Sequence, residues 1–347
     1  MIIIGCDLHT RTQQIAMLDT ETGEVVEKRL EHDGGEAQRF YEGLKEPALV
    51  GIETTGYTRW FAEMLSELGH ELVVGEAGKI RSQRSRKQKH DRGDAELLLN
   101  LLVRGDFPKV WLPPPAERDV RVLIEHRHQL VELRTRAKNG LQAMALSYGL
   151  RKRRRLWSAV GQEELKKIPL REGMGRRRED LLRLLAQLNT WVKELDQRIE
   201  EEVARRAEAQ RLMTHPGVGA QTALATVLVL GPVERFPDTR HLTSYLGLIP
   251  EEDSSGSRQR FGHLTKQGNR LMRFLLVEAA QTASRFDPGL RRMYRRLAFR
   301  KGAPIAKVAV ARKLAIRLFI MLRDQIDYAE FVRRASHAGM LGDVALV

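Results

Sequence analysis

The sequence predicts an α/β domain at the N-terminus, followed by a long helical region. Short apolar runs rich in β-branched residues alternate with amphipathic segments up to about residue 112. A stiff, proline-rich break, WLPPP, follows at residues 111–115. Beyond it, apolar residues recur at helical spacing over most of the chain. We therefore expect three domains, at residues 1–112, 113–212 and 213–347.

The first domain begins with three strands and then alternates helix and strand. IIIGCDL, QQIAMLD and EVVEKRLEH have strand character, and the turn TETG joins the last two. The next four elements, in chain order, are the helix EAQRFYEGL, the strand ALVGIE, the helix TRWFAEMLSELG and the strand HELVVGE. An apolar helix opens at Asp91. A strand meander followed by βαβ units predicts a mixed sheet covered by helices.

The middle region contains a heptad pattern. Its apolar positions, which alternate steps of four and three, are Leu181, Leu185, Leu188, Val192, Leu195 and Ile199. This spacing is typical of a coiled coil, which could join two chains or pair two long helices of one chain. From residue 213 onwards, apolar helices surround a single long polar loop, so an all-α C-terminal domain is expected.

The charge of the chain favours a polyanionic partner. Its 59 Lys and Arg residues against 45 Asp and Glu residues give a net charge of +14. Nucleic acid is the first candidate and an acidic membrane the second, although a basic but unrelated enzyme would have the same balance. Cys6 stands alone in an apolar strand, which excludes an internal disulfide and a thiolate zinc cluster. No run is long enough to span a membrane and no signal peptide is recognised, so a cytoplasmic location is expected.

Four carboxylates form a candidate metal site. Asp7 lies within an apolar strand, where an unpaired charge is costly, and Glu53 ends another strand. Asp91 and Asp94 are three residues apart at a helix start and share one face. If the first and fourth strands are neighbours, all four could converge on Mg²⁺ or Mn²⁺. The alternative is structural, because Asp91 is also a good N-cap and Asp94 favours the helix dipole.

Basic side chains accompany both candidate reactive regions. The run before the aspartate pair contains Arg81, Arg84, Arg86, Lys87 and Lys89, and further runs, RKRRR and GRRRED, lie at residues 151–155 and 175–180. The polar loop contains Ser254, Ser255 and Ser257, with Arg258, Arg260, Lys266 and Arg270 around them. These runs could be solvated faces or phosphate clamps. The serines could form a flexible turn, or one could be a nucleophile whose phosphate is stabilised by the cations.

Motifs from both ends of the chain resemble a single family. The first domain is similar to RuvC-like, ribonuclease H-like nucleases in its meander and acidic residues, and GCDLHT, GIETTGY and KHDRGDAELL resemble the DEDD transposases of insertion sequences. HPGVGAQTA and the stretch RFPDTRHLTSYLGLIPEEDSSGSRQRFGHLTKQGNRLMRFLLVEAA resemble the second transposase domain of the same family. This is the "one-ten" type, related to the Piv invertases, and the resemblance spans nearly the whole chain.

The resemblance implies roles for particular residues. Asp7, Glu53, Asp91 and Asp94 match the DEDD set, and the family's serine falls on Ser255 or, one residue earlier, on Ser254. It also implies Mg²⁺-dependent recombination of donor and target double-stranded DNA. A non-coding bridge RNA would guide the reaction, and dimers joined by the heptad helices would pair into tetramers.

Two other functions remain open from the sequence. A metal-dependent, junction-resolving nuclease of RuvC-like fold would use the carboxylates alone and leave the serine loop structural. A non-catalytic nucleic-acid scaffold would need no metal, but the near-complete carboxylate set argues against it.

Overall fold

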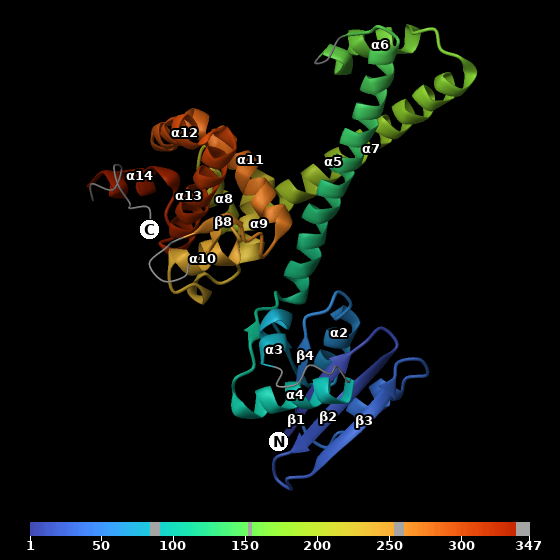
Figure 1. Ribbon diagram of the computed structural model, residues 1–347, viewed down its shortest axis with the longest axis vertical. Helices are drawn as coiled ribbons and strands as arrows, with labels where there is room; N and C mark the ends of the chain where they lie inside the picture. Colours follow the sequence, from blue (N-terminus) through green and yellow to red (C-terminus); the bar gives the residue numbers. More distant parts are fainter. Residues whose placement is uncertain (84–90, 152–154, 253–259, 338–347) are drawn as a thin grey trace. The chain divides into compact units, whose positions relative to one another are not determined.

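A computed structural model describes residues 1–83, 91–151, 155–252 and 260–337 (Figure 1). The chain divides into two compact units, Met1–Leu112 and Pro113–Val347. The first unit is α/β and the second is mainly helical, as expected from the sequence. The predicted division at residue 212 stays a prediction. Within the described part of the chain, no helix combines the length and apolar character needed to cross a membrane.

The first unit is built on a six-stranded mixed sheet of order β3-β2-β1-β4-β5-β6. β1 pairs with β2 antiparallel and with β4 parallel, so the first and fourth strands are neighbours. The elements are β1 (Ile2–Leu8), β2 (Thr12–Asp19), β3 (Val25–Glu31), α1 (Glu36–Glu42), β4 (Ala48–Glu53), α2 (Arg59–Glu67), β5 (Glu71–Gly75), α3 (Ala77–Ser82), α4 (Asp91–Arg104) and β6 (Lys109–Val110). The meander and the βαβ units follow the predicted order, with α3 and β6 as short additions.

The two faces of this sheet support separate apolar cores. Ile4 and Cys6 of β1 face a core that includes Tyr41 of α1 and Phe61 of α2. Ile3, from an alternate position of the same strand, faces the core formed by α4. Cys6 is fully buried, and burial raises the pKa of its thiol, which agrees with a core role. Alternation along β1 therefore directs its odd-numbered residues, including Asp7, towards α4.

Two long helices begin the second unit. α5 (Pro115–Ser147) and α7 (Glu172–Ala204) pack against each other, and α6 (Ala159–Lys167) lies between them in the chain (Figure 1). The predicted seam is buried on α7 from Leu185 to Ile199, and its first residue, Leu181, is half-buried. Leu188 lies in a core with Leu130 of α5. The apolar seam of α7 is thus buried against α5 of the same chain. This packing does not establish a coiled coil between two chains.

The remaining helices surround the largest core of the protein. Apolar side chains of α9, α11 and α13 fill it, and the inner ends of α5 and α7 contribute to it. The elements after α7 are α8 (Ala207–Met213), α9 (Ala220–Leu230), α10 (Thr239–Tyr245), β7 (Pro250–Glu252), β8 (Phe261–Leu264), α11 (Arg270–Phe286), α12 (Pro288–Lys301), α13 (Ala303–Arg323) and α14 (Tyr328–His337), with a 3₁₀ turn at Val233–Arg235. Another 3₁₀ turn, Arg155–Trp157, precedes α6.

The prediction of an all-α C-terminal domain is wrong in one respect. β7 and β8 pair as a short antiparallel sheet at the base of the polar loop. The strands have only three and four residues, too few for a period-of-two pattern to be recognised in the sequence.

The HPGVG segment forms a buried turn. Gly217 has a φ of 88°, and a Cβ there would lie 2.5 Å from the backbone nitrogen of Ala283 in α11, so only glycine fits. His215 is 1% exposed, and its ring packs edge-on against Tyr328 at 4.7 Å between centroids. The hydroxyl of Tyr328 and the guanidinium of Arg317 both donate hydrogen bonds to Asp287. The turn therefore anchors helices of the C-terminal core.

Burial lowers the pKa of His215 to about 4, which predicts acid sensitivity. Unfolded histidine binds a proton below about pH 6.5, whereas folded His215 stays neutral until about pH 4. We expect the free energy of unfolding to be highest above pH 6.5 and to fall by up to about 3 kcal/mol towards pH 4. Urea unfolding at pH 7 and pH 5 measures this difference. His215→Gln should make the free energy of unfolding less dependent on pH. His126→Gln, at an exposed position of α5, should leave the profile as steep as in the parent chain.

Candidate active site

Asp7 lies near the end of β1, on the sheet face that α4 covers. Its carboxylate is 17% exposed, so it is reachable from solvent but largely enclosed. Cys6 of β1 is in register with Ile52 of the neighbouring parallel strand β4. The next residues along the two strands, Asp7 and Glu53, therefore lie side by side at the same edge of the sheet. The carboxyl edge of the parallel strands thus carries two of the four predicted carboxylates.

Gly5 allows α4 to approach the sheet. A Cβ on Gly5 would lie 2.2 Å from the carbonyl oxygen of Ala95 and 2.3 Å from the nitrogen of Leu99. Both are backbone atoms of α4, so the helix lies directly on β1 at a residue without a side chain. Asp91 is one helical turn before Ala95, and the close contact therefore brings the start of α4 to Asp7.

Three ligand-type side chains converge at this point. His9 Nε2 lies 3.2 Å from Asp7 Oδ2 and 3.5 Å from Asp91 Oδ2. Ligand atoms from Asp7, His9 and Asp91 all lie within 4.8 Å of one another. His9 follows directly after β1, and its backbone nitrogen donates to Thr12 in the turn to β2. His9 was not predicted as a ligand, although its position two residues after Asp7 was a usable signal.

The geometry of this group fits a divalent cation. Two ligands of one Mg²⁺ ion are at most ~4.2 Å apart, because each metal–oxygen bond is ~2.1 Å. The two separations that involve His9, 3.2 Å and 3.5 Å, fall within this limit, and the three ligand atoms together lie within 4.8 Å of one another. His9 Nε2 is buried, and among the described residues it forms no hydrogen bond of acceptable geometry. Carboxylates suit Mg²⁺ and Mn²⁺, whereas imidazole is a less common ligand of either ion.

The other two predicted carboxylates lie outside the converging group. Glu53 Oε1 accepts a hydrogen bond of 3.4 Å from Arg81 at the end of α3. Asp94 lies in the first turn of α4 with Asp91 but is not one of the three clustered ligands. The structure thus brings Asp7 and Asp91 together directly and places Glu53 on the adjacent strand with a cationic neighbour.

The ETTGY turn after β4 is fastened to the same edge of the sheet. The hydroxyl of Tyr57 donates to the carbonyl oxygen of Leu8 at 3.2 Å, and the hydroxyl of Thr54 donates to Gly75 at 2.6 Å. These bonds tie the end of β4 to the ends of β1 and β5. They position the backbone on both sides of Asp7 and Glu53.

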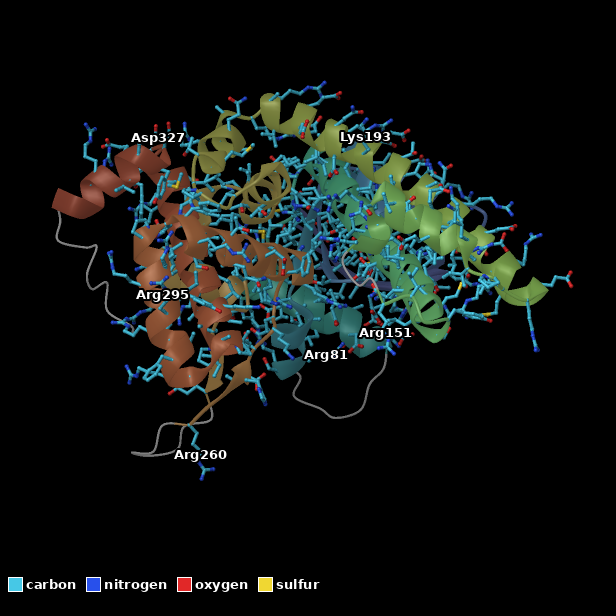
Figure 2. All side chains as sticks on the ribbon, turned by 90° about the horizontal axis from the view of Figure 1, so that it is seen from above. Arg81, Arg151, Lys193, Arg260, Arg295 and Asp327 are labelled. Carbon is cyan, nitrogen blue, oxygen red and sulfur yellow. The ribbon has the colours of Figure 1, made fainter. Side chains whose placement is uncertain are left out.

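The predicted phosphate-binding runs are described only in part. Arg84, Arg86, Lys87 and Lys89 lie outside the described residues. Arg81, labelled in Figure 2, is 69% exposed and forms an ion pair with Glu53. In the run at residues 175–180, Arg178 donates to the carbonyl oxygens of Leu165, Lys166 and Ile168, so it fastens α6 to α7. This arginine has a structural role, which is neither of the two interpretations, solvated face or phosphate clamp, that the sequence left open for the run.

The serine loop has an ordered base. Ser254, Ser255 and Arg258 lie outside the described residues, but β7 and β8 pair on either side of them. A Cβ on Gly247 would lie 2.1 Å from the carbonyl oxygen of Gln267, and one on Gly268 would lie 2.0 Å from that of Tyr245. Both glycines have positive φ, so the two chain segments cross in close contact below the loop.

Cations surround this base. Arg260, Lys266 and Arg270 are all exposed, and Figure 2 shows Arg260 directed away from the helices of its unit. Arg273, by contrast, donates to the carbonyl oxygens of Leu246 and Gly268 and stabilises the crossing. The serine loop therefore extends from a closely packed pair of strands and turns whose exposed side chains include positively charged ones.

Two separate parts of the chain match two family models. Residues 4–149 match the IS110-type DEDD model described as "Transposase", and residues 209–295 match "Transposase IS116/IS110/IS902 family". A transposase for the insertion sequence element IS1111A of Coxiella burnetii is 30% identical over 70% of this chain and 69% of its own length. The chain belongs to the IS110 family of DEDD transposases.

Other relatives of this IS110-family transposase show similarity over larger or comparable shares of the chain. A probable family 20 transposase of Pseudomonas aeruginosa is 27% identical over 94% of this chain and 98% of its own length. A transposase for insertion sequence element IS1328 of Yersinia enterocolitica is 25% identical over 68% and 70%, respectively. The protein is therefore an enzyme of DNA transposition, and its DEDD type implies a divalent metal ion at the carboxylate group.

Proposed function

We propose that this transposase cuts and rejoins DNA strands, with Mg²⁺ held by carboxylates of the first unit and Ser255 as nucleophile. The convergence of Asp7, His9 and Asp91 within 4.8 Å is the observation that carries the proposal. Glu53 on the adjacent strand and Asp94 in the same helix turn lie outside this group and would join it as further ligands when the metal binds. Mn²⁺ would satisfy the same oxygen ligands.

The reaction is a pair of transesterifications. The hydroxyl oxygen of Ser255 attacks the phosphorus of a DNA phosphodiester, one P–O bond to the sugar breaks, and the departing oxygen gains a proton. The resulting phosphoserine linkage retains the bond energy, so a hydroxyl end of another strand can displace the serine and rejoin the DNA. When bound, the metal polarises the phosphate and stabilises the developing negative charge. Arg260, Lys266 and Arg270 would bind the neighbouring phosphates.

We further propose that a bridge RNA selects donor and target DNA. The chain has several basic runs, and its described residues contain no recognised motif that reads base edges in a DNA groove. This combination suits a protein that binds the nucleic-acid backbone while base pairing with a guide RNA reads the sequence. Assembly into dimers and tetramers is supported by a second apolar stripe on α7. Leu184 and Trp191 are one heptad apart and are 44% and 42% exposed, so they are available to a second protomer.

A covalent intermediate tests the serine proposal directly. With labelled DNA and Mg²⁺, we expect a protein–DNA adduct that survives denaturing electrophoresis. Ser255→Ala should abolish both the adduct and strand exchange, while Ser254→Ala, which removes the adjacent hydroxyl, should retain them. Loss in Ser254→Ala with retention in Ser255→Ala would contradict the assignment.

A junction-resolving nuclease is the second candidate function. The clustered carboxylates all belong to the first unit, and such a group can activate water without any serine. This alternative predicts hydrolysed ends, no adduct and full activity of Ser255→Ala. The same gel therefore separates the two functions.

A further inference from the structure

A long segment near the C-terminus carries only positive charges. Residues 288–323, which include α12 and α13, contain eleven Lys and Arg residues and no Asp or Glu. Arg317 within this segment is buried and paired with Asp287 at 2.7 Å, so it is structural. Arg323, the last residue of α13, pairs with Asp324 just beyond the segment. The other nine are on or near the surface, where like charges repel unless a polyanion compensates them.

Part of this segment lines a cleft. The cleft has a volume of about 400 Å³, and α11, α12 and α13 form it. Its lining residues are Gln281, Ser284, Arg285, Arg291, Tyr294, Arg295 and Lys307. Four of the seven are cationic and none is acidic. Figure 2 labels Arg295 on the outer side of these helices.

The cations of this cleft have no carboxylate partners within the described ranges. Arg291 donates to the carbonyl oxygen of Arg285, which fixes its direction without neutralising its charge. Arg295 and Lys307 form no ion pair there, whereas Arg333 and Arg334 of α14 both pair with Glu330. The cleft therefore presents uncompensated positive charge together with the hydrogen-bonding groups of Tyr294 and Gln281.

An exposed aromatic ring continues the same face of α12. Arg291, Arg295 and Phe299 are spaced by four residues, so they lie along one side of the helix. Phe299 is 95% exposed, and Phe286, beside Arg285 at the end of α11, is 66% exposed. Exposed aromatics next to cations are typical of surfaces that bind unpaired strands, because bases stack on the rings while phosphates contact the cations.

We propose that this cleft binds an unpaired DNA strand, with phosphates on Arg291, Arg295 and Lys307 and a base stacked on Phe299. Strand exchange by a transposase separates DNA strands, which supplies such a ligand. Duplex DNA would contact the cations but could not stack on Phe299, because its bases are already stacked. The proposal concerns binding alone, and it would stand if the serine or the metal assignment failed.

Binding of labelled oligonucleotides to the full chain in EDTA tests the cleft. We expect Arg295→Gln/Lys307→Gln to weaken affinity for a 20-nucleotide single-stranded DNA about tenfold or more, and to reduce its salt slope by about 1.4. Arg333→Gln/Arg334→Gln removes the same charge from paired arginines and should change affinity less than threefold. Phe299→Ala should weaken single-strand binding at least about fivefold and leave duplex binding unchanged.

Folding and ligand choice are controlled separately. Thermal unfolding should be unchanged in Phe299→Ala, because that ring is exposed. Single-stranded DNA carrying 5-iodouracil should photo-crosslink to a peptide of α12 in the parent chain. Equal losses in the two charge-removing double variants would overturn the proposal, as would a Phe299→Ala effect on duplex equal to that on single strands. Tighter binding of single-stranded RNA with the same dependence on these residues would overturn the choice of DNA.

Discussion

Asp7→Asn should lower the rate of DNA strand cleavage by about 10³-fold or more and leave DNA affinity within about threefold. Asparagine keeps the shape of the side chain but removes the charge that faces His9 at 3.2 Å and the Asp91 carboxylate beyond it. A bound metal contributes several kcal/mol of charge stabilisation, and about 4 kcal/mol corresponds to roughly 10³-fold in rate. Cleavage of labelled DNA under saturating protein, in Mg²⁺ and in Mn²⁺, measures the effect.

The control for this substitution is Asp106→Asn. Asp106 is exposed beyond the end of α4, away from the carboxylate group along the helix, and its replacement removes the same charge. It should cleave at the parent rate. Cleavage by Asp7→Asn at more than about a tenth of the parent rate would refute its role as a metal ligand, and so would an equal loss in Asp106→Asn.

The fold of the first unit was predictable because its signals are local. Strands such as Ile2–Leu8 and Ala48–Glu53 are continuous apolar runs, and helices such as Arg59–Glu67 have a clear apolar face.

α12 of the second unit had no such signal, since its sequence PGLRRMYRRLAFRK is polar on most sides. Its ends were nevertheless marked. Asp287 caps the N-terminus by accepting from Leu290, Pro288 takes the first position, and Gly302 follows the last turn.

The heptad pattern identified a buried face but not its partner. The apolar stripe of α7 would have the same spacing against α5 of its own chain or against a second chain. Packing within the chain is decided by the loop that contains α6, which returns α7 alongside α5. Sequence periodicity contains no information about that choice.

The candidate site was predictable in part. Asp7 was selected because it lies within an apolar strand, Glu53 because it ends a strand, and Asp91 because it stands at a helix start. The parallel pairing of β1 with β4 brings the first two to one edge. His9 and the Arg81–Glu53 contact were not foreseen, because both depend on side-chain directions across elements distant in sequence. The serine loop was singled out by its serines among cations, and the choice of Ser255 within it rests on the resemblance to the family.

Gly5→Ala should disrupt the carboxylate group although it changes neither charge nor polarity. The added Cβ would meet backbone atoms of α4 at 2.2 Å and 2.3 Å, and neither backbone atom can rotate away. Either α4 moves outwards, which separates Asp91 from Asp7, or β1 distorts. Overpacking of this kind costs about 1–3 kcal/mol, and more where backbone must shift. We expect a destabilisation of about 3 kcal/mol in urea unfolding of the full chain.

Gly93→Ala separates this effect from the general consequence of replacing a glycine. Gly93 lies in α4 between the two aspartates, and a Cβ there meets no atom within 4 Å. Alanine in a helix should stabilise by about 0.5–1 kcal/mol. Titration with Mn²⁺, followed by the paramagnetic relaxation of water protons, should show weaker binding in Gly5→Ala and unchanged binding in Gly93→Ala. If Gly5→Ala bound Mn²⁺ as tightly as the parent chain, close contact between α4 and β1 would not be what assembles the site.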